Sequence, residues 1–530
     1  NFKERRDHMS RLPVLTMAPR GDSRSIGSFL GLNKGIVIGE NEFSDMKNMS
    51  SDSFPAISTR KTRGKVIKTL AKPHGLFYKN GLAYVDGTKL YYKDAEVGDV
   101  SDTDKKIAGM GAYIVIFPDK IMLNTATGEV ESLEASWTQA SSASFAQTTT
   151  GSTMVKISCT GIGKAFSQYD GVEISGCTNT DFNKTTVIQE LGNDYIVIIG
   201  DLASGFSQSS GLTIKRTVPD MDFICENGNR IWGCSSENHE IYSSKLGDPK
   251  NWQAYEGIST DSYAATVGSD GDFTGCISHM GYVLYFKEDV IHTVYGDKPS
   301  NYQITTNAPV RGIAKGCEGT ACIVNETLLY VSRSCVCSYD GAMPDSVSDA
   351  LSEMRFTDGT AGQYNGKYYA SLKDAAGNWG LYVYDLKKGL WHKEDSLHAL
   401  FMAYGAGELY YIDAAGNLAT IAGDREELIE WELESGDMLE GSVEYKYVKR
   451  LLFNLMLEPG SEVDVFLKCD GQEEFKKENT FTAKNYRTQT LCVIPERCQR
   501  YRYRLEGKGP AKLIAIGKYI GYGSDLHGNL

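Results

Sequence analysis

Short runs of apolar and aromatic residues, separated by Gly, Asn or Asp, dominate the pattern along the 530-residue chain. Runs such as Tyr282–Phe286 and Leu381–Tyr384 are apolar at nearly every position, which is typical of strands that are packed on both faces. Helical periodicity is nearly absent. The sequence therefore predicts an all-β fold.

The runs pair into a loosely repeated hairpin, in which an aromatic-rich run, a turn and a second run follow one another. Apart from one long interruption, the hairpins recur about every 30–55 residues, close to the roughly 40–50 residues of a four-stranded propeller blade. Closing blades into a ring also shelters sheet edges. The pattern predicts a β-propeller, and a stack of β-sandwiches is the alternative. The hairpins are Gly75–Asp94, Ile107–Val130, Ile224–Lys245, Ile277–Asp297, Ile323–Gly341, Gln363–Asp395 and Phe401–Asp424.

The long interruption lies between Val130 and Thr217. It begins with a linker rich in Ser and Thr at Gln139–Ser152, which is followed by a set of short strand-like runs. Because exposed loops tolerate insertions, we interpret this segment as a small β-barrel inserted in one connection; a long decorated loop is the alternative. The runs are Met154–Cys159, Gly171–Ser175, Thr185–Glu190, Tyr195–Ile199 and Leu212–Lys215.

After Gly423 the strands lengthen. Leu428–Glu434 alternates cleanly, so Ile429, Trp431 and Leu433 are expected to face inward. Long runs divided by turn signals follow, and they predict a closing β-sandwich. These runs are Gly441–Leu457, Glu462–Lys468, Thr488–Ile494, Arg500–Leu505 and Ala511–Tyr519. The expected domains are an N-terminal arm at 1–30, a first propeller part at 31–136, an inserted β-domain at 137–216, a second propeller part at 217–424 and a C-terminal β-sandwich at 425–530.

The formal net charge of −13 argues against a reader of DNA sequence, because such a surface repels phosphates. The basic residues are nevertheless clustered, once in the first 24 residues and again at 60–68. We interpret both clusters as a solvated arm and a solvated loop, with docking onto an acidic neighbour as the alternative. The candidate docking residues are Arg5, Arg6, Arg11 and Arg20, and the second cluster is Arg60, Lys61, Arg63, Lys65 and Lys68.

Neither a metal nor a cofactor is expected from the sequence. The twelve cysteines contain no C-x-x-C pair, and the eight histidines never occur at metal-ligand spacing. Cys335 and Cys337 lie in an alternating strand, so their sulfurs face the same side by period alone. No apolar run approaches the roughly 18–20 residues of a membrane span, so none is expected.

Enzymatic activity is not expected either. Asp374–Trp379 and Asp413–Leu418 vaguely suggest the aspartate box of sialidase-like propellers, S-x-D-x-G-x-x-W, but each has one residue too many between Asp and Gly. A hairpin turn explains both segments. No P-loop and no G-x-S-x-G elbow occurs, and no acid and nucleophile pair can be assembled. No catalytic residue is therefore named.

Three stretches resemble virion proteins of tailed phages. The most specific is the central one, Asn229–Trp232 with Ile241–Ser243 and Leu246–Trp252. Together the stretches resemble the phage stabilisation or tail-nozzle family, whose members form propeller-based rings at the tip of the short tail and control the passage of DNA. The other stretches are Gly31–Asn33, Asn48–Ser50 and Phe54–Arg60 near the start, and Leu457–Val463, Pro495–Cys498 and Arg504–Gly509 near the end.

The resemblance implies a non-enzymatic component of the virion, assembled in the host cytoplasm: a nozzle or hub subunit in a homo-oligomeric ring, a hexamer by family. Its partners would be other tail proteins and double-stranded DNA that passes an acidic lumen without sequence-specific binding. The implied structural motif residues are Arg230, Trp232, Asp248, Pro249 and Trp252, in which Pro249 sets a turn and Trp252 packs between sheets. A carbohydrate- or receptor-binding tail protein and a propeller glycosidase are the alternatives.

Overall fold

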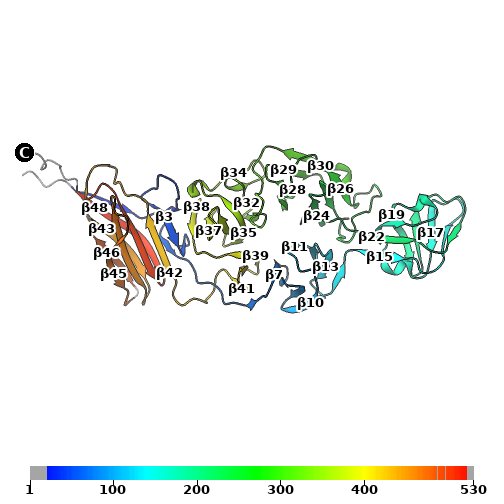
Figure 1. Cartoon of the computed structure of the whole chain (residues 1–530), viewed down its shortest axis with the longest axis horizontal. Coiled ribbons are helices and arrows are strands. Elements are labelled where there is room, and N and C mark those ends of the chain that lie inside the picture. The colour runs from blue at the N-terminus through cyan, green and yellow to red at the C-terminus, as the bar shows by residue number, and fades with distance from the viewer. Residues whose placement is uncertain (1–20, 486, 496, 522–530) are drawn as a thin grey trace, which may run out of the picture.

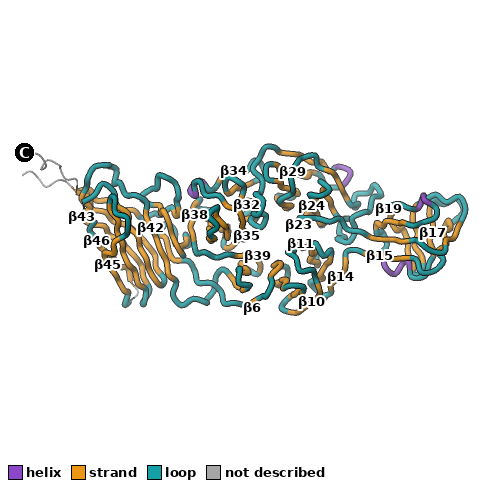
Figure 2. The backbone as a smooth tube through the Cα atoms, in the orientation of Figure 1, coloured by secondary structure: helices purple, strands orange, loops and turns teal. Residues whose placement is uncertain are grey.

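The computed structural model describes residues 21–485, 487–495 and 497–521, and Figure 2 shows that this part consists of strands and connecting loops with a few short helical turns. A β-propeller lies between a β-sandwich and a small β-barrel along one long axis (Figure 1). The all-β fold class expected from the sequence is confirmed. The helical turns of the described part are four short 3-10 segments, η1 (Ile162–Ala165), η2 (Thr180–Phe182), η3 (Pro299–Asn301) and η4 (Asp349–Leu351).

The propeller consists of seven four-stranded sheets within the described residues, and each predicted hairpin lies in one of them. We number these blades 1 to 7 in chain order. Blade 1 contains β7 (Pro73–Tyr78), β8 (Leu82–Asp86), β9 (Lys89–Tyr92) and β10 (Ala95–Asp99), and blade 2 contains β11 (Lys106–Met110), β12 (Tyr113–Phe117), β13 (Ile121–Asn124) and β14 (Val130–Ser132). Blade 3 contains β23 (Phe223–Asn227), β24 (Arg230–Ser235), β25 (Glu240–Ser243) and β26 (Tyr263–Thr266); blade 4 contains β27 (Gly275–His279), β28 (Tyr282–Lys287), β29 (Val290–Tyr295) and β30 (Gln303–Asn307); and blade 5 contains β31 (Cys322–Val324), β32 (Thr327–Val331), β33 (Val336–Tyr339) and β34 (Asp345–Ser346). Blade 6 contains β35 (Phe356–Tyr364), β36 (Lys367–Asp374), β37 (Trp379–Asp385) and β38 (Leu390–Lys393), and blade 7 contains β39 (Ala399–Gly405), β40 (Glu408–Asp413) and β41 (Asn417–Thr420) together with β6 (Lys68–Thr69).

The ring of blades is closed by a strand from the beginning of the propeller. β6 precedes blade 1 in sequence but pairs with β41 as the outermost strand of blade 7, with Thr69 opposite Asn417. The inner strand β39 of blade 7 also packs beside β7 of blade 1. Neighbouring blades bury shared clusters, such as Phe286 of blade 4 against Tyr330 of blade 5. Such burial is the main stabilisation of the ring.

The insertion is a barrel of eight strands with its own core. Its sheet runs in the order β15-β22-β18-β19-β20-β17-β16-β21, and the side chains of Gln139 and Gln208 bridge the two ends of this order. Within the linker expected at 139–152, Ala143–Gln147 is a strand that buries Phe145, so that part of the prediction was wrong. The strands are β15 (Ala135–Thr138), β16 (Ala143–Gln147), β17 (Met154–Ser158), β18 (Gly171–Ser175), β19 (Thr185–Gly192), β20 (Tyr195–Ile199), β21 (Phe206–Gln208) and β22 (Thr213–Arg216).

The sandwich contains strands from both ends of the described chain. One sheet holds β1 (Gly21–Ile26), β4 (Met49–Ser50), β5 (Ile57–Thr59), β43 (Tyr447–Leu457), β46 (Arg487–Val493) and β48 (Ala511–Gly521). The other holds β2 (Gly31–Leu32), β3 (Glu42–Lys47), β42 (Glu430–Ser435), β44 (Glu462–Cys469), β45 (Lys476–Thr482) and β47 (Tyr501–Lys508). As expected, Ile429, Trp431 and Leu433 are buried.

Two expected domain boundaries are corrected by this pairing. Residues 21–59 do not form an arm and the start of the propeller; they supply five strands of the sandwich. The insertion begins at Ala135 and not at 137, because β15 pairs with β22. The sequence conceals β3 because a bulge between Phe43 and Asp45 breaks its alternation, and its partner β42 lies almost 400 residues away.

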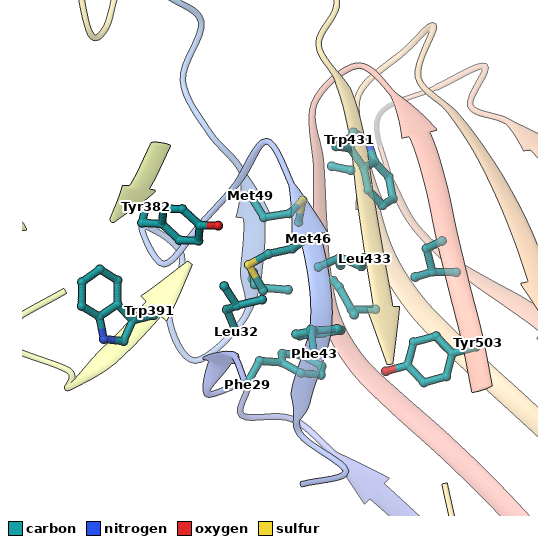
Figure 3. Close-up of a cluster of buried hydrophobic side chains, with 14 of the residues drawn as sticks. Phe29, Leu32, Phe43, Met46, Met49, Tyr382, Trp391, Trp431, Leu433 and Tyr503 are labelled. Carbon is teal, nitrogen blue, oxygen red and sulfur yellow. The ribbon is translucent and has the colours of Figure 1, made fainter. Parts of the chain in front are cut away.

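The N-terminal strands fill the space between the propeller and the sandwich. Figure 3 shows Leu32 and Met46 between Trp391 of blade 6 on one side and Trp431 and Leu433 of β42 on the other. All five side chains are buried. Blade 6 and the sandwich therefore share one hydrophobic core, and their relative position is fixed by packing.

Candidate functional site at the two propeller junctions

The predicted motif residues of blade 3 serve as structural elements. Arg230 is buried, and its guanidinium donates to the backbone carbonyls of Ser244, Ser259 and Asp261. Trp232 lies in the cluster between blades 3 and 4, where its indole nitrogen donates to the carbonyl of Asn227 at 3.1 Å. A buried guanidinium satisfied by three carbonyls fixes the outer loop of the blade.

The second half of the motif forms a tight turn after β25. The carboxylate of Asp248 accepts the backbone N–H of Lys250 at 2.9 Å, and burial raises the pKa of this carboxyl. The indole of Trp252 donates to the carbonyl of Pro249 at 2.9 Å. Trp252 is buried in the cluster shared by blades 2 and 3, which also contains Phe117. The expected roles of Pro249 in a turn and of Trp252 between sheets agree with this geometry.

This turn also contacts the inserted barrel through hydrogen bonds. The side-chain amide of Asn251 donates to the carbonyl of Tyr169 at 2.7 Å, and its oxygen accepts the N–H of Gly171 at 2.9 Å. Gly171 is required here, because a Cβ would lie 2.4 Å from the carbonyl carbon of Gln253. Asn251, between the motif residues Pro249 and Trp252, thus connects blade 3 to the barrel, a role that the sequence did not predict.

A buried ion pair completes the barrel junction. The guanidinium of Arg216, at the end of β22, lies 2.5 Å from a carboxylate oxygen of Asp170 and also donates to the carbonyl of Leu133. Both charged side chains are buried. Removing one partner would leave the other charge without compensation. The pair therefore fixes Arg216 within the barrel, and the hydrogen bond from Arg216 to Leu133 links the barrel to the end of blade 2.

The junction between propeller and sandwich contains a second group of buried charges. Arg63 enters from the segment before β6, and its guanidinium lies 2.7 Å from Glu394 and 2.8 Å from Asp395. It also donates to the carbonyl of Ile421. Burial by itself raises the pKa of Glu394, but the charges of Arg63 and Arg60 and the hydrogen bond and charge of His392 together outweigh it and hold this pKa at about 2. Neighbouring His392 is fully buried, and desolvation lowers its pKa.

Arg60 extends this network toward the sandwich. Its guanidinium donates two hydrogen bonds to the carboxylate of Glu426, at 2.8 and 3.0 Å, and one to the side-chain oxygen of Asn48 at 2.7 Å. Asn48 in turn donates to the carbonyl of Glu430. The interpretation of 60–68 as a solvated loop was therefore wrong for Arg60 and Arg63: they dock onto acidic residues of the same chain. Their local sequence gives no signal of this, because the partners lie more than 300 residues away.

The two segments that suggest an aspartate box are hairpin turns. In each, the aspartate carboxylate accepts backbone N–H groups two and four residues ahead: Asp374 from Ala376 and Asn378, and Asp413 from Ala415 and Asn417. Hydrogen bonds from Asn378 lower the pKa of Asp374. Both carboxylates are occupied in shaping their own turns, as the sequence predicted.

No group of three or more metal-ligating side chains occurs among the described residues. The sulfurs of Cys335 and Cys337 lie 3.6 Å apart, so they do face the same side of their strand. In the described part, no helix is both long and apolar enough to cross a bilayer. The candidate docking residues Arg5, Arg6, Arg11 and Arg20 lie outside the described residues.

Comparisons with known proteins define similarity only at the level of solved structures. No family model matches the chain, and no curated protein does. The chain is similar to a sialidase from Trypanosoma rangeli, at 8% identity and TM-score 0.23 over 95% of this chain and 96% of that one. It is similar to an exo-β-1,3-galactanase from Phanerochaete chrysosporium, at 10% identity and TM-score 0.21 over 56% and 95%.

A third similar structure is the endosialidase of phage phi92, at 11% identity and TM-score 0.17. That match covers 78% of this chain and 56% of the endosialidase. Identities and TM-scores of this size establish no shared activity, substrate or partner.

Proposed function

We propose that the protein is a non-enzymatic structural subunit of a phage tail, a nozzle or hub subunit whose copies form a ring through which DNA is retained and then ejected. The observation that carries this proposal is the place of Leu246–Trp252, the stretch that resembles tail-nozzle proteins most specifically. Asn251 of this stretch holds the inserted barrel through hydrogen bonds to Tyr169 and Gly171, and Trp252 packs between blades 2 and 3. The stretch that carries the resemblance thus has a structural role, at the contact between blade 3 and the barrel.

The build of the molecule supports the same proposal. Buried charges lie at both ends of the propeller: Arg216, paired with Asp170 inside the barrel, donates to the carbonyl of Leu133 after blade 2, and Arg63, in the segment that links sandwich and propeller, pairs with Glu394 after blade 6. The sandwich also shares a hydrophobic core with blade 6. Buried contacts of this kind hold the three domains of the elongated subunit in a fixed relative orientation. A rigid subunit is what a tail protein under the pressure of packaged DNA requires.

The proposal of a ring of subunits rests on the width of duplex DNA compared with the axial hole of one propeller. A propeller encloses only a narrow axial hole, so a conduit for DNA has to run between subunits and not through one of them. A subunit with net charge −13 repels phosphates, whereas each Lys or Arg on a phosphate would strengthen binding through counterion release. We therefore propose a hexameric ring with an acidic lumen, in which the basic residues Arg5, Arg6, Arg11 and Arg20 contact a neighbouring tail protein.

Native mass spectrometry of the purified full chain, with negative-stain images of virions labelled by a gold-coupled antibody, tests this proposal. We expect closed rings in solution and label at the tail tip. A monomer in solution together with label along fibres or on the head would contradict it.

A carbohydrate-binding tail protein is the second candidate, and one observation favours it. Tyr282 and Tyr295 are exposed on blade 4 with ring centroids 4.8 Å apart, and exposed tyrosine rings can pack on the faces of sugars. A glycan array and a hydrolysis screen on the purified chain separate the possibilities. Glycan binding without ring formation would favour this candidate, and turnover would favour a propeller glycosidase.

A further inference from the structure

An apolar tip projects from the junction between propeller and sandwich. Ile36 and Val37, in the loop between β2 and β3, are 103% and 85% exposed, more than any other large hydrophobic residue of the described chain. Apolar side chains this fully exposed to water lose unfavourable hydration when a partner covers them, so they are suited to a contact between molecules. We call these two residues the knob.

The loop that carries the knob is held in one conformation. The carboxylate of Glu42 accepts the side chain of Asn33 and the N–H of Gly39, both at 2.7 Å, while Asn33 accepts the N–H of Gly35 at 2.8 Å. At its base, the N–H of Lys34 donates to the carbonyl of Ala350 beside blade 6. The knob therefore loses little conformational entropy on docking, because both its loop and its stiff side chains are already ordered.

A cavity of about 490 Å³ lies across the same junction. Leu397, Tyr411, Ala414 and Ala415 form its apolar part, and Asp413 and Arg425 are among its charged residues. We call it the socket. Knob and socket thus offer an apolar protrusion and a partly apolar recess on one chain.

The knob and the socket lie at opposite ends of β42. The knob loop precedes β3, whose Phe43 pairs with Ser435 at the end of β42. The socket includes Arg425 and Glu426, which precede the start of β42 at Glu430. In Figure 1 the loop before β3 is at the upper edge of the junction, and the connection from β41 to β42 runs along the lower edge. The two features therefore face opposite flanks at the same level along the molecule.

We propose that the knob of one copy inserts into the socket of the next copy and so forms the contact of the ring. A head-to-tail contact between two different surfaces generates a closed ring when the rotation closes without a rise. Features at one level along the molecule meet the second of these conditions, the absence of a rise. The inference rests on the proposed function, since it names the contact that holds the proposed ring.

The test compares the full chain with an Ile36→Asp/Val37→Asp double variant and with Met343→Asp, a matched control at an exposed apolar residue of blade 5. Because burial of each knob side chain contributes about tenfold or more to affinity, the double variant should raise the dissociation constant between copies at least about a hundredfold. Met343→Asp should leave it unchanged. Native mass spectrometry over a concentration series measures both.

Cross-linking identifies the socket independently. An Ile36→Cys/Ala414→Cys variant, oxidised with diamide, should give a disulfide between copies that peptide mass spectrometry assigns to these two positions. If rings persist in the double aspartate variant and this cross-link is absent, the knob-and-socket contact is wrong while the proposed ring stands. If the wild-type chain stays monomeric, or forms dimers through Ile36 of both copies, the proposed ring fails as well.

Discussion

The Glu394→Gln substitution tests the junction between propeller and sandwich most sharply, because it removes one buried charge and keeps the size of the side chain. The pKa of Glu394 is about 2, against an ordinary value of 4.5. At 1.36 kcal/mol for each pH unit, this difference corresponds to about 3 kcal/mol of favourable interaction of the carboxylate with Arg63 and its other neighbours. The neutral amide would leave Arg63 with Asp395 as its remaining charged partner. We expect the free energy of unfolding to fall by about 3 kcal/mol at pH 7.

The loss should depend on pH in a defined direction. The folded-state pKa of Glu394 lies below its unfolded value, so its stabilisation is complete above about pH 4.5 and disappears as the pH falls toward 2. The wild type and the variant should therefore converge in stability between pH 4.5 and 2. Asp424→Asn is the control, since Asp424 forms an exposed pair with Lys65 that is worth about 0–1 kcal/mol.

Urea unfolding monitored by tryptophan fluorescence measures this loss, because Trp391 and Trp431 flank the junction (Figure 3). A decrease below about 0.5 kcal/mol at pH 7, or a decrease that is the same at pH 7 and pH 3, would show that the charge of Glu394 does not stabilise the junction.

Three further predictions concern the barrel and blade 3. Asp170→Asn leaves Arg216, which donates to the carbonyl of Leu133 after blade 2, buried without its charged partner, so this end of the barrel should loosen and be cleaved faster in limited proteolysis; an unchanged cleavage rate would argue against this role of the pair. Replacing 135–216 by a short turn should leave the propeller melting cooperatively, because the barrel buries its own core and its two ends are paired; loss of cooperative melting would show that the insertion belongs to the propeller. Trp252→Ala should cost about 3–5 kcal/mol in chemical unfolding, whereas exposed Tyr255→Ala should cost far less, and equal effects would contradict the packing role of Trp252.

The sequence predicts the blades well because their information is local. Each hairpin contains its two inner strands and its turn, and runs such as Leu381–Tyr384 are buried on both faces as their composition indicates. The same holds for β42, where strict alternation places Trp431 and Leu433 inside. A pattern confined to about 20 or 30 residues is enough to identify such elements.

The parts that the sequence does not predict depend on distant partners. β2 and β4 contain two residues each, too few for any periodicity, and they become strands only because the sandwich and blade 6 enclose them. Arg63 is indistinguishable from a solvated residue until Glu394 and Asp395 lie beside it. The knob at Ile36 also has no sequence signal, since a short apolar run between glycines is equally typical of a buried strand.

A cryo-electron microscopy structure of the assembled tail, at a resolution that shows side chains, tests the central claim most directly. We expect a ring of copies of this chain around a channel wide enough for duplex DNA, with the channel bounded by several subunits and lined mainly by Asp and Glu. A lumen lined mainly by Lys and Arg, or a single copy on the outside of the virion, would contradict it.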